Sequence, residues 1–255
     1  MTSTAAILLA GGRIKSKDRA EWQSLLPSGS DNRVMVDIGG KPMYRYVIDA
    51  IRGADIQLVI AGDVPFDGKH IRVAGGDSLV DTLLNGIAAL PPAVSQVLVL
   101  TADIPFLTSA GIDAILQSAP NADFVYTIIP MDTCRAAFPD AKRTSLKTAD
   151  GEFTGGNIVL INPEFVRNNE AVIRESFERR KDVLALGKLL GPDVIFRLLL
   201  SRLFPALLPI DALERAVSRL VGNATVKALV VNDAAVGTDI DSASDVAMAR
   251  KVLGK

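Results

Sequence analysis

The feature that most constrains the fold is a short apolar run, residues 5–10, that stops abruptly at Gly11 and Gly12. The run is shorter than a typical helix and ends at a glycine pair, so we predict a buried strand followed by a sharp turn. Ligands of open α/β sheets bind at the carboxyl ends of the strands, where glycines let the backbone come close to them. Arg13 adds a planar guanidinium that suits phosphate. The turn therefore predicts a site for nucleotide phosphates, with an ordinary strand-to-loop turn as the alternative.

Strand-like and helix-like segments alternate along much of the remaining chain. Strands are expected at residues 56–62, 97–100, 124–129, 158–161 and 226–231, and helices at residues 42–51, 78–90 and 109–116. This alternation favours an α/β fold with a mostly parallel central sheet and helices on both faces. Residues 168–222 look helical throughout. We therefore predict a main domain of residues 1–167 and 223–255, with a helical insertion of residues 168–222.

The composition excludes several classes of protein. Lys and Arg number 28 and Asp and Glu number 29, which gives no electrostatic reason to expect a nucleic-acid partner. The single Cys134 and the single His70 exclude a disulfide framework and a Cys/His zinc site. The amino terminus lacks the cationic segment of a signal peptide, and no apolar stretch reaches the ~18 residues of a membrane-spanning helix. The expected location is therefore the cytoplasm.

Asp103 is the carboxylate that the pattern places best for chemistry. It follows the apolar run at residues 97–100, so it should lie at the carboxyl end of a central strand. A carboxylate there needs a partner, because an unpaired buried charge is costly. Mg²⁺ binds through one or two carboxylates, waters and substrate phosphates, which makes a metal ion the favoured partner. Local capping of a helix is the alternative.

A second acidic pair, Asp239 and Asp241, lies near the end of the chain. The two residues alternate, so in an extended segment both side chains face the same side. We rank Asp241 above Asp239 as the second metal ligand. Ser242 and Asp245 have the spacing of a helix cap, which is compatible with a ligand role for Asp241 just before them.

Two basic residues are candidates for binding phosphate. Lys41 follows a glycine pair and precedes the helix expected from Pro42, so its charge coincides with the free N–H groups of a helix start. Arg33 follows a long polar loop, residues 14–32, and loops of this length in compact domains are often functional. For either residue, a solvated surface position is the alternative.

Two further stretches contain glycine pairs. Gly75 and Gly76 lead into a helix, with Asp77 or Ser78 at its N-cap position. Residues 154–157, Thr-Gly-Gly-Asn, precede an expected strand and carry little side-chain bulk. We expect a ligand to approach the backbone closely there.

These motifs, in this order, resemble those of the nucleotidyltransferase superfamily with a GT-A-like, Rossmann-type fold, which includes the MobA-like NTP transferases. The segments concerned are residues 9–13, 40–43, 101–106 and 239–246. They are similar to the family's opening glycine loop, its Gly-Lys-Pro motif, the segment with its metal aspartate, and its acidic ending. The resemblance covers about residues 5–165 and 224–253. Two departures are that the loop after Arg13 is less rich in small residues, and that Arg33 stands where the family usually has a lysine.

The resemblance implies a nucleotide-diphospho-sugar transferase-like fold and a reaction. That reaction is Mg²⁺-dependent transfer of a nucleoside monophosphate from an NTP, CTP or GTP, to a phosphorylated small-molecule acceptor, with release of pyrophosphate. By this resemblance Arg13, Lys41 and Asp103 would be catalytic, and Asp103 and Asp241 would hold Mg²⁺. The residues that would contact the NTP or the acceptor are Leu9, Ala10, Gly11, Gly12, Arg33, Gly76, Ser78, Gly155, Gly156 and Asn157.

The sequence leaves two other functions open. One is a glycosyltransferase of related fold that uses a nucleotide sugar, and the other is a non-catalytic nucleotide-binding protein. The early glycine loop and the Lys-Pro motif favour nucleotidyl transfer over glycosyl transfer. Release of pyrophosphate from an NTP separates nucleotidyl transfer from the other two functions.

The helical insertion has an apolar face. Its residues are Ile195, Leu199, Leu203 and Leu207. Core packing is the favoured role for this face, and covering the acceptor pocket is one alternative. A homodimer contact is another alternative, as is a membrane-surface contact to which Arg197 and Arg202 would contribute.

Overall fold

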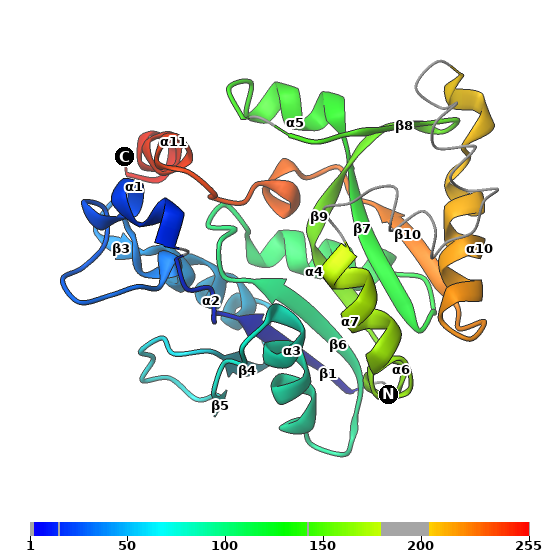
Figure 1. The fold of residues 1–255 in the computed structure, drawn as a ribbon, viewed down its shortest axis with the longest axis horizontal. Helices are drawn as coiled ribbons and strands as arrows, with labels where there is room; N and C mark the ends of the chain where they lie inside the picture. Colours follow the sequence, from blue (N-terminus) through cyan, green and yellow to red (C-terminus); the bar gives the residue numbers. More distant parts are fainter. Residues whose placement is uncertain (1–2, 15, 142, 180–203, 255) are drawn as a thin grey trace.

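A central sheet of eight strands organises the described part of the chain, which comprises residues 3–14, 16–141, 143–179 and 204–254 of a computed structural model. The strand order is β10-β7-β9-β6-β1-β4-β5, with β8 paired to β9 (Figure 1). The sheet strands are β1 (Ser3–Leu9), β4 (Gln57–Ala61), β5 (Ile71–Val73), β6 (Val94–Thr101), β7 (Phe124–Pro130), β8 (Leu146–Thr148), β9 (Gly151–Ile161) and β10 (Val226–Val230). A separate small hairpin consists of β2 (Asp37–Ile38) and β3 (Lys41–Pro42).

Helices connect most of the strands. The α-helices are α1 (Arg19–Gln23), α2 (Met43–Gly53), α3 (Leu79–Ala88), α4 (Ser109–Ser118), α5 (Met131–Ala137), α6 (Pro163–Asn168), α7 (Glu170–Arg179), α10 (Ile210–Leu220) and α11 (Ala243–Leu253). Short 3₁₀ turns are η1 (Ser16–Asp18), η2 (Arg33–Met35), η3 (Pro205–Leu207) and η4 (Ala234–Gly237). The alternation predicted from the sequence is confirmed.

The sheet is mostly parallel, as predicted. β1 runs parallel to both of its neighbours, β4 and β6, and β4 runs parallel to β5. β7 and β10 form a second parallel pair. Only β9 among the long strands is reversed, because it pairs antiparallel with both β6 and β7. One antiparallel strand therefore joins two parallel halves.

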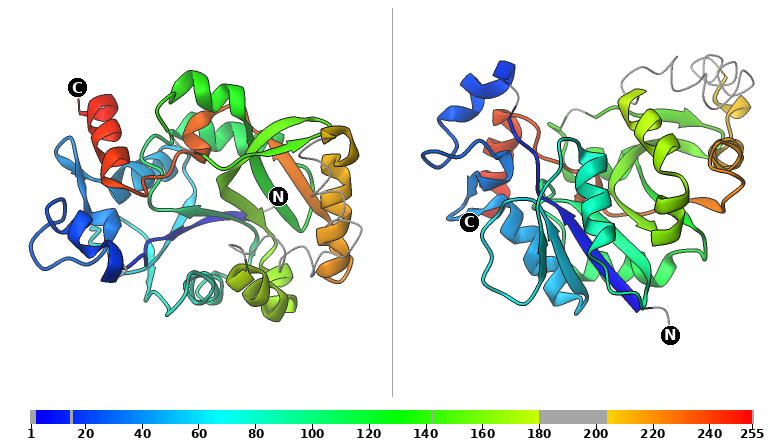
Figure 2. Two further views of the ribbon diagram at one scale, coloured as in Figure 1. Left: turned by 45° about the horizontal axis from the view of Figure 1, so that its top comes forward. Right: turned by 60° about the horizontal axis from the view of Figure 1, so that its bottom comes forward.

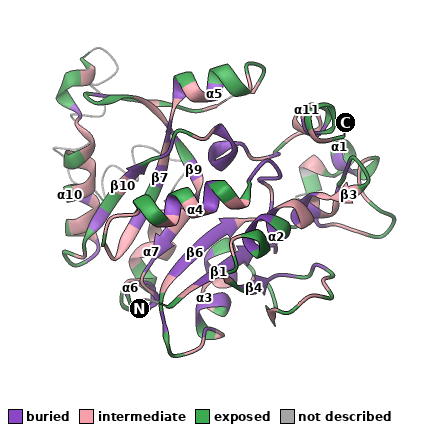
Figure 3. Ribbon diagram, turned by 180° about the vertical axis from the view of Figure 1, so that it is seen from behind, coloured by how far each residue is buried: buried purple, intermediate pink, exposed green. Residues whose placement is uncertain are grey.

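Helices cover both faces of the sheet, and each face has its own core. Successive side chains of a strand point to opposite faces. Ala6 and Leu8 of β1 accordingly pack in the core beneath α2, α4 and α11, whereas Ala5 and Ile7 pack in the core beneath α3, α6 and α7. Figure 2 shows the helices on the two sides, and Figure 3 shows that buried positions concentrate along the central strands.

One expectation about strand boundaries is wrong. Residues 154–157 were expected to precede a strand, but they lie within β9, which begins at Gly151. The reason is the short β8–β9 hairpin, in which Leu146 pairs with Phe153 and extends the ladder in this direction.

Both described ends of the predicted insertion pack on the sheet. Val172 and Ile173 of α7, and Val217 of α10, pack against the core on the α3 face. Leu207 lies in η3 and is 40% exposed. The predicted apolar residues Ile195, Leu199 and Leu203, with Arg197 and Arg202, lie outside the described residues. The division into a main domain and an insertion therefore stays a prediction.

Within the described ranges, we find no helix with the length and apolar character needed to cross a membrane.

Candidate active site

The carboxyl ends of the central parallel strands meet at one edge of the sheet. Ala10 donates its N–H to Ala61 O at 2.8 Å, and Ala102 donates to Leu9 O at 3.1 Å. These bonds continue the ladders one residue past β1 and β6. The glycine turn after β1 and the aspartate after β6 therefore lie side by side, as the sequence predicts.

The backbone of the glycine turn is closely packed at Ala10 and Gly11 but open at Gly12. A Cβ on Gly62, whose φ is +140°, would lie well under 3.0 Å from the backbone of Ala10, so only glycine fits there. Gly11 lies near Thr82 and Gly75, which places the loop before α3 against the turn. Gly12 has nothing within 4 Å of a built Cβ. The open side of Gly12 is where a ligand could approach the backbone.

Asn32 fastens the long loop to the end of β1. Its side-chain Nδ2 donates to Ala10 O at 2.8 Å, and its Oδ1 accepts from Val34 N at 3.2 Å. The second bond caps η2, the 3₁₀ turn that carries Arg33. Because one side chain makes both bonds, the position of Arg33 is tied to the glycine turn.

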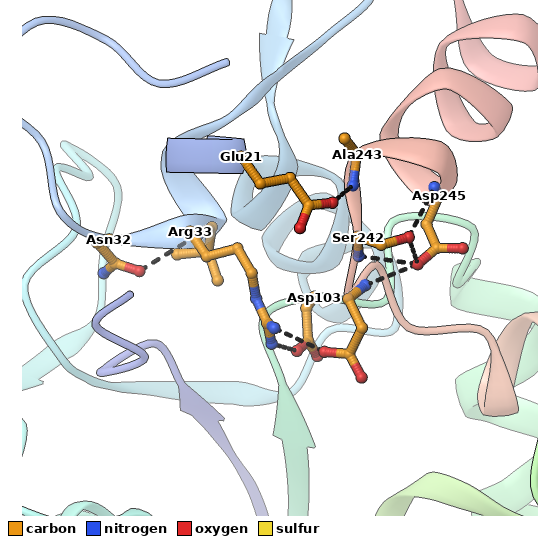
Figure 4. Close-up of polar contacts among 9 residues, drawn as sticks. Glu21, Asn32, Arg33, Asp103, Ser242, Ala243 and Asp245 are labelled. Atoms are coloured by element: carbon orange, nitrogen blue, oxygen red, sulfur yellow. Dashed lines mark hydrogen bonds and ion pairs between the residues drawn. The ribbon is translucent and has the colours of Figure 1, made fainter. Parts of the chain in front are cut away.

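Arg33 connects the two predicted metal ligands. Its guanidinium donates to Asp103 Oδ2 at 2.7 Å and to Asp241 Oδ1 at 2.6 Å (Figure 4). The ring of Trp22 lies 5.7 Å from its Cζ. Burial alone would lower the pKa of Arg33, but the charges of Asp103 and Asp241 raise it overall, so the guanidinium is positively charged. We expected Arg33 to contact phosphate, and in this structure its direct partners are the two carboxylates.

Asp239 adds a third carboxylate to this cluster. Burial raises its pKa to about 7, with further contributions from the charges of Asp103 and Asp241. The intervening Ile240 donates its N–H to Asp103 O at 2.9 Å, which ties the acidic segment to the end of β6. Arg33 thus pairs with two aspartates and feels the charge of a third, so the carboxylates of the cluster outnumber its one basic group.

A helix cap holds the acidic segment in place. Ser242 and Asp245 form the predicted capping box at the start of α11, and Asp245 also accepts from the N–H of Asp241. Glu21 of α1 accepts from Ala243 N at 2.7 Å (Figure 4). The long loop is therefore fastened to β1 at its carboxyl end, through Asn32, and to α11 near its middle, through Glu21.

The carboxylates of this cluster are sufficient to bind Mg²⁺, which needs few ligands from the protein. Asp103 Oδ1 is buried and has no hydrogen-bond partner, although its other oxygen is paired with Arg33. The described residues contain no ready-made group of three or more His, Cys, Asp or Glu around a metal position. Mg²⁺, however, commonly uses one or two carboxylates and takes its other ligands from water and phosphate. Asp103 and Asp241 are the residues that would hold it.

Two predicted catalytic residues have partners other than the three aspartates. Arg13 is 83% exposed at its side chain, and its Nε lies 3.9 Å from Asp31 Oδ2. Lys41 forms an ion pair with Asp49 of α2 and lies 4.1 Å from the ring centroid of Tyr46. The structure therefore does not bring Lys41 to Asp103.

The loop before α3 also has its polar groups engaged. Ser78 is the N-cap of α3, one of the two N-cap candidates from the sequence, and it forms a capping box with Asp81. The N–H of Gly76 donates to Thr82 Oγ1 at 3.0 Å. Contact between Gly76 or Ser78 and a base stays a prediction, and the hydroxyl of Ser78 is already used in the cap.

The glycine pair of β9 forms an irregular stretch next to the acidic segment. The register of β9 on β7 shifts between Tyr126 and Ile128, so Thr127 faces Gly156, Asn157 and Ile158 together. Thr127 Oγ1 donates to Ile158 O at 2.6 Å and closes this bulge. Bulges often occur beside functional sites, where they redirect the backbone.

Gly155 packs close to the acidic segment. A Cβ built on Gly237, two residues before Asp239, lies 3.4 Å from Gly155 O. The predicted acceptor stretch and the predicted metal segment are therefore neighbours.

Sequence reasoning missed three residues that build this site. Gly62 and Asn32 shape and anchor the glycine turn, and Tyr126 places its hydroxyl over Gly155. A glycine directly after a strand was a usable signal for Gly62. Asn32 and Tyr126 had none, because their partners Ala10 and Gly155 are distant in sequence.

Comparison with known proteins identifies the family and the fold of the chain. The profile of the MobA-like NTP transferase domain matches residues 6–184. A hypothetical transferase from Thermus thermophilus is 31% identical, with a TM-score of 0.83, and the match covers 96% of this chain and 100% of that one. No curated protein matches the chain.

Two characterised folds are similar at lower identity. The 2-C-methyl-D-erythritol 4-phosphate cytidylyltransferase from Thermus thermophilus is 14% identical, with a TM-score of 0.54 and coverage of 99% of this chain and 98% of that one. The CMP:2-keto-3-deoxy-manno-octonic acid synthetase complexed with CTP is 15% identical, with a TM-score of 0.58 and coverage of 99% and 98%. At these identities the likeness concerns the fold. The domain match and the 31% identical transferase show that the chain belongs to the MobA-like NTP transferase family and is a nucleotidyltransferase.

Proposed function

We propose that the protein transfers a nucleoside monophosphate from CTP or GTP to a phosphorylated small-molecule acceptor in a Mg²⁺-dependent reaction. The observation that carries the proposal is the cluster at the sheet edge, where Asp103 and Asp241 pair with Arg33, and Asp239 lies close enough to couple to them, beside an open glycine turn. A triphosphate needs positive charge and free N–H groups around it. The open glycine turn would offer the N–H groups, and Arg33 together with Mg²⁺ held by the carboxylates would offer the positive charge.

The reaction requires no covalent nucleophile from the protein. An oxygen of the acceptor phosphate would form a bond to the α-phosphorus with its own electron pair. The bond from the α-phosphorus to the bridging oxygen would break, and its electron pair would leave with pyrophosphate. The work of the chain is therefore alignment and charge stabilisation.

The residues divide this work between them. Gly11 and Gly12 would let the phosphates approach the backbone, and the exposed Arg13 can swing onto them. Asp103 and Asp241 would hold Mg²⁺, which when bound supplies positive charge to the phosphates and the leaving pyrophosphate. Arg33 lies between the same two carboxylates and can share its charge between them and the phosphates.

The test is a pyrophosphate assay with each NTP, Mg²⁺ and a panel of phosphorylated metabolites. Asp103→Asn should lower pyrophosphate release by about a hundredfold or more, because the uncharged amide would hold Mg²⁺ more weakly and the transition state would lose that positive charge. Asp123→Asn is the matched control. Asp123 lies just before β7, at the other end of the sheet, and accepts from Thr225 N, a bond that asparagine can keep.

The outcomes separate the competing functions. Nucleotide binding without pyrophosphate release from any acceptor would identify a non-catalytic binding protein. Release of a nucleoside diphosphate from a nucleotide sugar would identify a glycosyltransferase. Unchanged turnover in Asp103→Asn would remove Asp103 from the mechanism.

A further inference from the structure

Tyr126 presents a hydroxyl that the protein itself does not use. Among the described residues, Tyr44 and Tyr46 donate their hydroxyls to backbone carbonyls, at Pro65 and Ile38 respectively. The hydroxyl of Tyr126 has no such partner in the described part of the chain. The residue as a whole is 38% exposed. The hydroxyl end is the more buried part of the side chain. A largely buried hydroxyl without a protein partner needs an acceptor, which a bound ligand could supply.

The hydroxyl of Tyr126 lies at the proposed site. A Cβ on Gly155 would lie well under 3.0 Å from the Tyr126 oxygen, so the hydroxyl rests directly over the bare Cα of this glycine. Gly237, which leads to Asp239, packs against the same glycine. Burial of the hydroxyl end raises the pKa of Tyr126, and the charge of Asp239 raises it further. The hydroxyl therefore stays protonated at neutral pH and can donate a hydrogen bond.

An open cavity of about 520 Å³ continues along the same face of the sheet. Val230 pairs with Ile128, two residues beyond Tyr126, and Phe153 pairs with Pro130. Val230, Phe153 and Pro130 all line the cavity. Strand residues two apart lie on one face and are separated by roughly 7 Å. The cavity therefore begins one side chain away from Tyr126.

The surface that this cavity offers to a ligand is mainly apolar. Its three acidic lining residues already have partners in the protein. Asp132 and Glu152 pair with Arg135, and Asp150 accepts from Ile210 N. Val230, by contrast, is 45% exposed. The acidic rim would repel a second anionic group, so the cavity favours an uncharged, apolar occupant.

We propose that Tyr126 binds the acceptor, donating a hydrogen bond to a phosphate oxygen of a phosphate monoester whose apolar organic part occupies the cavity lined by Pro130, Phe153, Ile210 and Val230. This inference rests on the proposed nucleotidyl transfer, because it takes the acceptor phosphate to lie beside Asp239. The apolar part then points away from the carboxylates, along β7 and β9. Tyr126 sets the position of the phosphate, and Val230 sets the preference for an apolar substituent.

Isothermal titration calorimetry with methyl phosphate and butyl phosphate, in the presence of Mg²⁺, tests both parts. The wild-type protein should bind butyl phosphate more tightly, by about fourfold for each methylene group that the cavity buries. Tyr126→Phe should weaken the binding of both esters about tenfold, the effect of one lost hydrogen bond to a charged group. Tyr44→Phe, which also removes one hydroxyl, should leave both affinities unchanged.

A matched pair of valines tests the cavity. Val230→Asp should abolish the advantage of butyl over methyl phosphate, because it places a charge in the apolar lining. Val252 of α11 is 46% exposed and lies outside the cavity, so Val252→Asp should have no effect. Melting temperatures of all variants, together with CTP and GTP binding, verify that each variant is folded.

Three results would overturn the inference. They are equal affinity of wild type and Tyr126→Phe for both esters, equal affinity of the wild type for methyl and butyl phosphate, and no binding of either ester. None of these measurements requires turnover. If one of these three results is obtained while the wild type still releases pyrophosphate from an NTP, only the acceptor assignment is overturned. The proposed nucleotidyl transfer then stands.

Discussion

The guanidinium of Arg33 lies 2.7 Å from the carboxylate of Asp103, although 70 residues separate them in sequence. Asp103 is 14% exposed at its side chain, and its second oxygen is buried without a partner. Arg33 is thus the main compensation for a carboxylate that is largely out of water. A divalent cation at Asp103 would supply compensation of the same sign.

Arg33→Ala should destabilise the metal-free protein by about 3 kcal/mol, because it leaves Asp103 without its counter-charge. Mg²⁺ should restore more stability to this variant than to the wild type. Urea denaturation with EDTA and with Mg²⁺ measures both effects. Arg215→Ala is the control, because it breaks an exposed pair with Asp211 that should contribute only about 0.3–0.5 kcal/mol. An identical Mg²⁺ response in Arg33→Ala and wild type would contradict the assignment of Asp103 as a ligand.

Gly155→Ala should destabilise the protein by about 2 kcal/mol, because the new methyl group meets the hydroxyl of Tyr126. Tyr126→Phe removes the atom that is struck first, so the double variant should recover much of this loss. A double-mutant cycle measured by urea denaturation gives the coupling free energy. Gly12→Ala should leave stability nearly unchanged, since nothing lies within 4 Å of its built Cβ. Strictly additive effects at Gly155 and Tyr126 would show that the two do not touch.

Asp239→Asn should change how stability depends on pH in the metal-free protein. Burial and neighbouring charges raise the pKa of Asp239 from 3.8 to about 7, so the folded state binds the proton more tightly than the unfolded state. The free energy of unfolding of the wild type should therefore fall as pH rises from about 4 to 7. The variant lacks this dependence and should gain stability relative to wild type at pH 8 but not at pH 4. Denaturation in EDTA at the two pH values provides the measurement. A variant that differs from wild type equally at both would exclude this effect.

Asn32→Ala should destabilise the protein by about 2 kcal/mol, because the buried carbonyl of Ala10 loses its side-chain donor. It should also weaken NTP binding, since η2 and Arg33 lose their connection to the glycine turn. Thermal denaturation and calorimetry with CTP and GTP measure the two effects. Asn85 makes a similar bond to Ala74 O at an exposed position, so Asn85→Ala should have a much smaller effect on stability. Equal losses in the two variants would mean that burial at Asn32 is unimportant.

The sequence predicted the sheet well because its signals are local. The apolar runs before Gly11 and before Asp103 are short, and each is followed directly by residues that favour a turn. Both are strands that end within one residue of the expected position. The capping box of Ser242 and Asp245 was equally readable, because its two partners are three residues apart. Fold class and the meeting of the carboxyl ends follow from such local patterns.

The contacts of the site were less predictable because they join distant segments. Nothing near Arg33 in sequence reveals that its partners are Asp103 and Asp241, and the spacing of Lys41 gave no sign of its pairing with Asp49. The extension of β9 through residues 154–157 depended on pairing with β8 and β7, which only the folded chain provides. Charge partners and bulges are tertiary properties.

The reversed strand β9 has a consequence for how such an enzyme can diversify. Its antiparallel ladders separate the strands that carry the glycine turn from β7 and β10, which face the cavity. Substitutions in β7, β10 and the elements around them can remodel one compartment without shifting the register of β1, β4 and β6. If the proposed acceptor site is right, the half of the sheet that would bind the NTP can stay unchanged while the half that would bind the acceptor changes its specificity.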